Sequence, residues 1–221
     1  MSELHEAIAN GDTGLAIKLI ENGADVNARH EGQTPLYVAL AYGKIRLFKY
    51  LKKTNAKIDS PCGPQSPLAV AIHHNQTKMI EYLVNKGGKN VNATFYRKKI
   101  PLNIAIDDDN LEMVKFLIKI GANVDNQDLH WYGDPTPLMH AMSKGNIEII
   151  KYIIDNGADV NDETVHEPAL IVAIRQNMFE VVKYLIEKGA DWKVISEYEK
   201  QLKEESIDRE IWDYIDHKIA S

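Results

Sequence analysis

Apolar and polar positions along this chain follow one pattern that returns every 32 to 36 residues. Its first part is a Thr-Pro-Leu opening with an alanine three residues after the leucine, as in Thr34 to Ala39. These openings begin at residues 34, 66, 100, 136 and, more loosely, 168, and a truncated copy surrounds Ala7. Recurrence in a fixed phase indicates six structural repeats.

A second part follows each alanine, 16 residues later in every repeat but the third, where Gly87 adds one position. It has the form Gly-Ala-Asp-Val-Asn at 23–27 and returns, with substitutions, at 55–59, 88–92, 121–125, 157–161 and 189–191. Between the two parts lie apolar residues with helical spacing, such as Val181, Tyr184 and Leu185. We therefore expect two antiparallel helices in each repeat.

Each part of the repeat has a physical reason. A hydroxyl residue before proline begins a helix, because the hydroxyl accepts a backbone N–H and the first helical position needs no donor. The alanine lets neighbouring helices approach closely, and the closing glycine takes the left-handed backbone that ends a helix. A pair of short helices cannot bury its apolar face alone, so stability must come from stacking between neighbours.

These residues resemble the ankyrin repeats, whose opening is Thr-Pro-Leu-His-x-Ala with a period near 33 residues. The resemblance covers about residues 3–192. It implies an all-α fold, an ankyrin-repeat solenoid of about six helix-turn-helix units with β-turn or hairpin fingers and a C-terminal helical cap. The family's histidine is replaced by Tyr37, Ala69, Asn103 and Met139, and Pro168 is shifted by one position. We expect these departures to change local turns and hydrogen bonds, not the architecture.

We expect residues 1–193 to form the repeat array and residues 194–221 to form a capping helical segment. The expected repeats span residues 1–29, 30–61, 62–95, 96–131, 132–163 and 164–193. In the cap, Ser196 and Glu199 have the spacing of a capping box ahead of a run of spaced apolar residues. In the alternative interpretation, Trp212 and Tyr214 expose a docking surface for a partner or a second chain.

One aromatic residue occupies the same place in the second helix of five successive repeats. These residues are Tyr50, Tyr82, Phe116, Tyr152 and Tyr184. A stripe at helical spacing usually belongs to the packed side of a helix. We therefore interpret these five residues as a packing ladder and not as a surface that stacks against a ligand.

The composition is that of an ordinary folded chain, with 221 residues of which 44% are hydrophobic and 26% charged. The net charge of −6 argues against nucleic acid as a partner, because phosphate backbones are bound by clustered cations. The single cysteine, Cys62, forms no internal disulfide and favours a reducing, cytoplasmic location. We expect no export signal and no membrane span. An effector protein that is exported without a standard signal peptide would have the same features.

The histidines do not form a recognisable catalytic or metal-binding motif. His5 and Glu6 begin like the helical zinc-protease motif, but alanine stands at position 9 in place of the second histidine. His73 and His74 are adjacent, so on a helix their side chains point about 100° apart and do not easily share one metal ion. We interpret them as solvent-facing.

The remaining candidates for chemistry are equally weak. Cys62 lies between Pro61 and Gly63 and has no basic neighbour in sequence to activate it. The three consecutive aspartates at 107–109 lack the alternate spacing of a calcium loop and are interpreted as a solvated acidic patch. We therefore expect no catalytic residue, no metal and no cofactor.

Proteins similar to ankyrin repeats generally bind partners through the turn before each first helix and the exposed face of that helix. By phase from the Thr-Pro-Leu opening, the turn candidates are His30, Glu31, Gln33, Gln65, Tyr96, Arg97, Lys99, Trp131 and Tyr132. The helix-face candidates are Tyr42, His73, His74, Asp107, Asp108, Lys144, Arg175 and Gln176. Trp131 and Tyr132 are the central candidates, because exposed aromatic residues dominate interface energetics. The alternative for Trp131 is local packing on a neighbouring repeat.

The expected function is therefore the non-catalytic binding of another protein by a chain that is monomeric alone. Without an attached catalytic domain it would act by occupancy, as a scaffold, an adaptor or an inhibitor. Three alternatives stay open: an immunity-type inhibitor or effector that blocks a specific enzyme, a metal or small-ligand site at His73, His74, Asp107 and Asp108, and self-association through the cap.

Overall fold

The structure, a computed structural model, is all-α in the part of the chain that it describes. That part comprises residues 2–57, 66–93, 100–125, 135–162 and 167–219. The chain divides into two compact units. The first is Met1–Asp108 with Lys119–Ala122, and the second is Asp109–Ile118 with Asn123–Ser221. No helix in the described ranges has the length and apolar character that crossing a bilayer requires.

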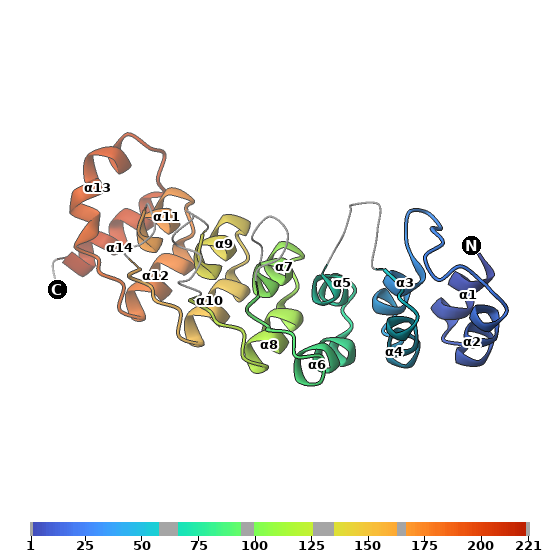
Figure 1. Ribbon diagram of the computed structural model, residues 1–221. Helices are drawn as coiled ribbons and strands as arrows, with labels where there is room; N and C mark the ends of the chain where they lie inside the picture. Colours follow the sequence, from blue (N-terminus) through green and yellow to red (C-terminus); the bar gives the residue numbers. More distant parts are fainter. Residues whose placement is uncertain (1, 58–65, 94–99, 126–134, 163–166, 220–221) are drawn as a thin grey trace. The chain divides into compact units, whose positions relative to one another are not determined.

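The first unit is built from helical hairpins. Its helices are α1 (Glu3–Asn10), α2 (Thr13–Glu21), α3 (Pro35–Ala41), α4 (Ile45–Lys53), α5 (Pro67–His73), α6 (Thr77–Asn85) and α7 (Pro101–Asp107). Helices α1 and α2, α3 and α4, and α5 and α6 pair within hairpins, while α1, α3, α5 and α7 pack in sequence on one another. Figure 1 shows α1, α3 and α5 in one row and α2, α4 and α6 in a second.

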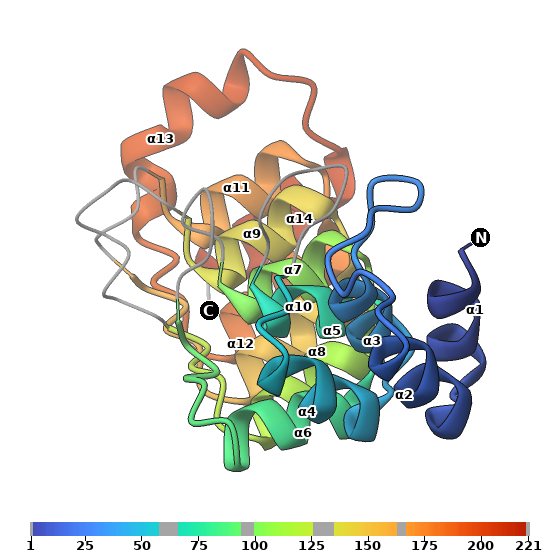
Figure 2. The same cartoon turned by 45° about the vertical axis from the view of Figure 1, so that its right-hand side comes forward.

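The second unit contains most of α8 (Leu111–Lys119) and all later helices. These are α9 (Pro137–Lys144), α10 (Ile147–Asp155), α11 (Ala169–Arg175), α12 (Phe179–Glu187), α13 (Val194–Lys203) and α14 (Arg209–Ile219). Helix α9 packs on α11 and α10 on α12, so the two hairpins lie side by side (Figures 1 and 2). Helix α13 then packs on α11 and α14 on α12.

The first helices begin where the repeat pattern predicts. The Thr34 hydroxyl accepts a hydrogen bond from Tyr37 N at 3.4 Å, and the Thr136 hydroxyl accepts one from Met139 N at 3.2 Å. Ser66 makes no such bond, so α5 begins with proline at its first turn but without a side-chain cap. Pro168 is the residue before α11, which confirms the shift by one position seen in the sequence.

The recurring alanine sits at the most closely packed point of each first helix. Ala39, Ala71, Ala105, Ala141 and Ala173 have no exposed surface. Because alanine adds only a methyl group, the first helices of neighbouring hairpins can approach each other there, as expected from the sequence. Larger side chains one turn away, such as Leu36 and Leu138, fill the space around this contact and are 1% and 2% exposed.

Asparagine side chains join successive loops within the second unit. Asn161 donates from Nδ2 to the carbonyl oxygen of Gly189 at 2.9 Å and accepts at Oδ1 from Asp191 N at 2.8 Å. Asn177 donates to the carbonyl oxygen of Ser206 at 3.0 Å and accepts from Asp208 N at 2.7 Å. Each amide thus satisfies one backbone donor and one backbone acceptor of the next loop.

The five aromatic residues of the predicted ladder are all half-buried on the second helices. In the first unit, the Tyr82 ring meets Phe48 edge-on with centroids 6.2 Å apart, and Lys49 Nζ lies 4.6 Å above it. In the second, the Tyr184 hydroxyl donates to Asp155 Oδ1 at 2.5 Å. These contacts tie α6 to α4 and α12 to α10, which agrees with a packing role for Tyr82 and Tyr184.

The C-terminal segment is helical, as expected, but its first helix does not begin where the sequence predicts. It forms two helices, α13 and α14, and the predicted capping box is wrong because Ser196 lies inside α13. Its hydroxyl donates to the carbonyl oxygen of Lys193 at 2.8 Å, and Glu199 pairs with Lys203. The reason is the turn at residues 191–193, where Asp191 Oδ1 accepts from Lys193 N at 3.0 Å, so that the helix starts three residues before the predicted first residue.

Candidate functional site

The first predicted finger is a two-residue hairpin turn at residues 30–33. His30 and Gln33 exchange backbone hydrogen bonds of 3.0 and 2.9 Å. Glu31 and Gly32 both have positive φ angles, 49° and 77°, as such a turn requires. Figures 1 and 2 show this loop standing beyond α3, and the Glu31 side chain is exposed at its tip.

A buried histidine that sequence reasoning set aside holds this finger in place. His5 is 1% exposed; its Nε2 lies 2.9 Å from the carbonyl oxygen of Gln33 and its Nδ1 lies 2.5 Å from the Ser2 hydroxyl. A proton on Nε2 lets the ring donate to Gln33 and accept from Ser2. The signal was present in the sequence, because His5 stands at the same repeat position as Tyr37, where the family pattern has histidine.

Three predicted residues occupy the same place on successive first helices of the first unit. Tyr42, His74 and Asp108 each directly follow the helix, after α3, α5 and α7. Tyr42 is 52% exposed, the highest value among the large hydrophobic side chains in the described ranges. An aromatic ring, an imidazole and a carboxylate therefore stand in register along the row that these three helices form. We call these three residues, together with His73 at the last position of α5, the first-helix ends.

Hydrogen bonds connect the first-helix ends to one another and to the helices. His73 Nδ1 lies 2.9 Å from Asp108 Oδ2, which joins α5 to α7. His74 Nε2 lies 3.2 Å from the Tyr37 hydroxyl, and the two rings meet edge-on with centroids 5.9 Å apart. The adjacent imidazoles therefore face different partners, as their predicted divergence on a helix implies.

The environment of His74 disfavours its protonated form. Partial burial lowers the pKa of His74 below its ordinary value, and the neighbouring His73 lowers it further. The carboxylate of Asp108 acts in the opposite direction but does not outweigh them. Neutral imidazole is consequently the stable form beside the Tyr37 hydroxyl.

The predicted acidic patch is a set of separately bonded carboxylates and not a purely solvated cluster. Asp108 pairs with His73 in the first unit, as described above. Asp109, which belongs to the second unit, accepts a hydrogen bond from Asn146 Nδ2 at 2.5 Å. Asp107 is half-buried. Among the described residues, no three His, Cys, Asp or Glu side chains are grouped so that they could hold a metal ion.

In the second unit, Lys144 and Gln176 are exposed at the ends of α9 and α11. Arg175 is half-buried and already engaged: its Nε lies 2.9 Å from Glu167 Oε1 and its Nη1 lies 2.6 Å from Glu205 Oε1. Its Nη2 also donates to Gln201 Oε1 at 2.9 Å. This geometry fastens α11 to α13, and a role of Arg175 in partner binding stays a prediction.

Six of the predicted contact residues lie outside the described part of the chain. They are Gln65, Tyr96, Arg97, Lys99, Trp131 and Tyr132. Cys62 also lies outside it. The expectation that binding centres on Trp131 and Tyr132 therefore stays a prediction from residue type.

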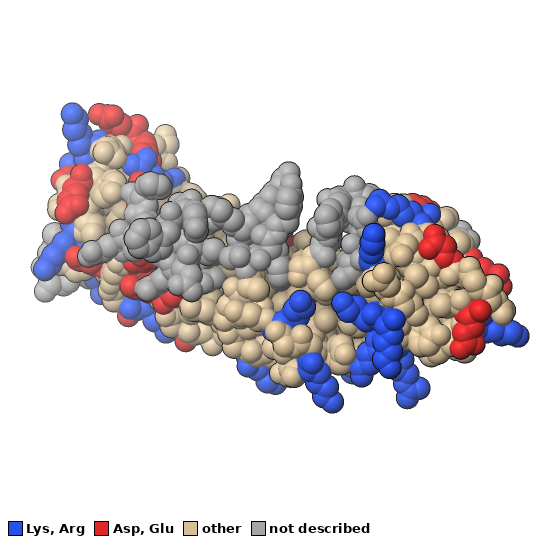
Figure 3. Space-filling model, viewed as in Figure 1, with Lys and Arg blue, Asp and Glu red and all other residues tan. Residues whose placement is uncertain are grey.

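The second helices of the first unit carry a different surface. Between residues 32 and 57 the chain has six Lys and Arg residues and no Asp or Glu. Figure 3 shows basic side chains gathered over α4 and α6. This excess of positive charge contrasts with the net charge of −6 of the whole chain, and composition alone does not reveal it.

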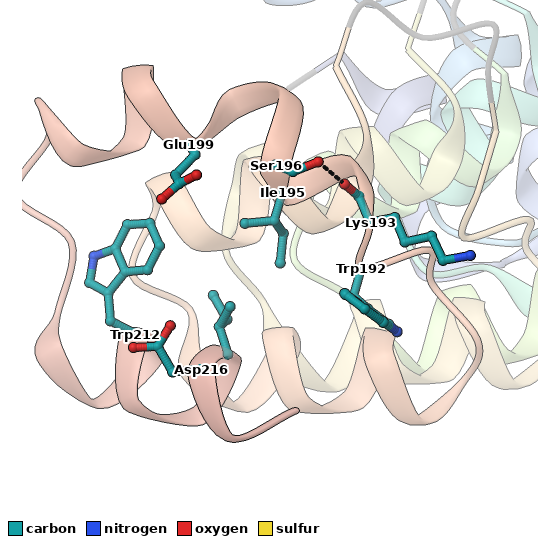
Figure 4. Close-up of a pocket in the computed structure, with 8 residues that line it drawn as sticks. Trp192, Lys193, Ile195, Ser196, Glu199, Trp212 and Asp216 are labelled. Atoms are coloured by element: carbon teal, nitrogen blue, oxygen red, sulfur yellow. Dashed lines mark hydrogen bonds between the residues drawn. The ribbon is translucent and has the colours of Figure 1, made fainter. Parts of the chain in front are cut away.

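A pocket of about 220 Å³ lies in the C-terminal part of the second unit, between α13 and α14 (Figure 4). Two tryptophans and two isoleucines form its apolar lining: Trp192, Ile195, Trp212 and Ile215. Tyr214, predicted together with Trp212 as an exposed docking residue, instead packs edge-on against Phe179 with centroids 5.8 Å apart. Only the tryptophan of that predicted pair borders the pocket.

Known proteins with the same repeat pattern match nearly the whole chain. The family model described as "Ankyrin repeats (3 copies)" matches residues 4–95, 47–128 and 102–196. The ankyrin repeat domain of Bcl-3, a unique member of the IkappaB protein family, is similar in structure. Its TM-score is 0.66 and its sequence identity 22%, over 86% of this chain and 87% of that one.

The human ASB11 ankyrin repeat domain is similar to the same degree, with a TM-score of 0.62 and 25% identity over 87% of this chain and 86% of that one. No curated protein matches the sequence. The expected all-α repeat architecture is thereby confirmed, and the likeness to the Bcl-3 domain concerns the fold alone.

Proposed function

Because the chain belongs to the ankyrin repeat family, whose domains are generally protein-interaction modules, we propose that it binds a protein partner through its first-helix ends and finger turns. We propose that the chain acts by occupying a surface of its partner and catalyses no reaction, so that it serves as a scaffold, an adaptor or an inhibitor. Fold does not determine function, so the proposal depends on the surface residues described above.

The observation that carries this proposal is the register of Tyr42, His74 and Asp108 on consecutive first helices. Fully buried residues beneath them, such as Leu40 and Ile72, hold the helices in fixed positions. A half-exposed tyrosine beside hydrogen-bonding groups is the kind of residue that dominates protein interfaces. A rigid support keeps the entropy cost of binding low.

The proposal includes two settings, one in which binding blocks the partner and one in which it brings two partners together. In one, the chain is an immunity-type inhibitor or an effector that covers the working surface of a specific enzyme. In the other, it joins two cytoplasmic proteins. A metal or small-ligand site at His73, His74, Asp107 and Asp108 is less favoured, because the two imidazoles are bonded to different partners.

The test is a comparison of partner affinity between the natural chain and the double variant Tyr42→Ala, His73→Ala. The partner is captured from the source organism on the immobilised full chain, identified, purified and titrated by calorimetry. We expect the variant to bind at least about tenfold more weakly, because truncating a central interface side chain removes roughly 2 kcal/mol or more. The thermal midpoint should stay within about 2 °C, since both side chains are exposed.

Leu15→Ala is the matched control. Leu15 is 38% exposed on α2, a second helix, so this variant removes a comparably exposed apolar side chain from a different face. Its affinity for the partner should be unchanged. Equal affinity of the double variant and the natural chain would contradict the proposed surface.

A further inference from the structure

The pocket between α13 and α14 has an apolar lining with a tryptophan at each end. Ile195 and Ile215 are buried, at 3% and 2% exposure, and form its floor. Trp192 and Trp212 are half-buried and stand at opposite ends of the pocket (Figure 4). Indole rings offer the strongest attraction to cations among aromatic side chains, through the negative face of the ring.

Two carboxylates border the same pocket. Glu199 extends from α13 and Asp216 from α14, and Figure 4 shows the Asp216 carboxylate beside Trp212. Glu199 is paired with Lys203, but no cationic side chain in the described ranges lies within ion-pair distance of Asp216. Lys193 is the single cation among the residues that border the pocket, and Figure 4 shows its ammonium directed away from Trp212.

The surroundings of the pocket are acidic as well. From Asp191 to Lys218 the chain has nine Asp and Glu residues and five Lys and Arg residues. Several of these charges are paired among themselves, as Arg209 is with Asp213 at 3.8 Å. The excess of carboxylates gives the region a negative potential that attracts cationic groups.

We propose that this pocket binds one arginine or lysine side chain presented by a peptide segment of another protein. Such a side chain has an apolar stem that matches the two isoleucines and a cationic head that matches Asp216 and the indole of Trp212 beside it. The volume of about 220 Å³ suits a single side chain, since pockets for drug-sized ligands begin at roughly 300 Å³.

This site is separate from the first-helix ends. All of its residues lie between Trp192 and Asp216, in the cap and the two residues that precede it. The proposal does not depend on the proposed function, and its test uses different residues. Failure of one proposal therefore leaves the other in place.

The first experiment titrates the full, isotopically labelled chain with two capped peptides that differ at one residue. One is acetyl-Gly-Ala-Arg-Ala-Gly-amide, and the other has citrulline, a neutral analogue of the same shape, in place of arginine. The indole N–H resonances of Trp192 and Trp212 report on the site, and a Trp131→Phe variant assigns the third tryptophan signal. We expect saturable shifts at both reporters and at least about tenfold weaker binding of the citrulline peptide, because only arginine carries the cation.

The second experiment compares Asp216→Asn with Asp213→Asn. Both changes remove one carboxylate from α14, but only Asp216 borders the pocket. We expect Asp216→Asn to weaken binding of the arginine peptide about fivefold and Asp213→Asn to change it less than about twofold. Both side chains are exposed, so equal thermal midpoints of the two variants serve as the folding check.

Four outcomes would overturn the proposal. They are no saturable shift at up to about 10 mM peptide, equal binding of the arginine and citrulline peptides, equal weakening by the two aspartate variants, and concentration-dependent dimerisation that Asp216→Asn abolishes. The last result would make a second copy of this chain the occupant.

Discussion

At the scale of single residues, the histidines show how neighbours decide the role of a side chain. His5 is buried and bridges the helix α1 to the finger at Gln33, whereas His73 is exposed and pairs with Asp108. His74 lies next to His73 in sequence but bonds the Tyr37 hydroxyl. Adjacent identical residues therefore differ in partner, because a helix turns their side chains apart.

The lowered pKa of His74 predicts a pH dependence of stability. The folded chain binds a proton at His74 less readily than the unfolded chain does, so this contribution to stability is fully present above the ordinary pKa of about 6.5 and is lost as pH falls through the lowered value. We expect His74→Gln to reduce the fall in thermal midpoint between pH 8 and pH 5. Identical profiles for the natural chain and His74→Gln would refute the role of His74.

At the scale of elements, the repeat motif specifies each helix, but side chains in the loops hold one hairpin to the next. The Gly-Ala-Asp-Val-Asn block predicts a helix end, and the glycines at 23, 121, 157 and 189 do take positive φ. The asparagine and aspartate side chains of this block also make hydrogen bonds that the local sequence pattern does not predict. Their amide and carboxylate groups bond the backbone of the following repeat, as in Asp125, whose Oδ1 accepts from Asp159 N at 2.8 Å.

Asn161→Ala tests the contribution of this bonding. The variant loses the bonds to Gly189 and Asp191, and we expect the free energy of unfolding in urea to fall by about 1 kcal/mol, since water replaces part of each exposed bond. Asn85→Ala, at the exposed end of α6, should change it by less than about 0.5 kcal/mol. A loss at Asn161 no larger than at Asn85 would show that these loop bonds do not stabilise the array.

At the scale of the whole molecule, stability depends on covering the last hairpin. Helices α13 and α14 pack on α11 and α12 and bury Ile195, Leu202, Ile211 and Ile215 almost completely. In a repeat protein each hairpin is stabilised by its neighbours, so an uncovered hairpin loses part of its folding free energy.

Removal of residues 194–221 should therefore destabilise the second unit. We expect the free energy of unfolding to fall by more than about 3 kcal/mol, since each fully buried side chain of this kind contributes roughly 1.5 to 3 kcal/mol. Hydrogen exchange should increase in α11 and α12. The control variant Glu197→Gln, Lys200→Gln alters only exposed residues of α13 and should match the natural chain. Unchanged protection of α11 and α12 after truncation would contradict a capping role.

The sequence by itself determined the number and phase of the hairpins, because proline, alanine and glycine act through local backbone geometry that recurs with every repeat. It also located Tyr42, His73 and Asp108 on the first helices, since phase assigns them to the ends of those helices. Only the tertiary structure decided which partners they take: the His73–Asp108 pair spans 35 residues, and the Arg175–Glu205 pair joins the end of α11 to the loop between α13 and α14. The split of the cap into two helices and the pocket between them also arise from long-range packing, which no periodic pattern records.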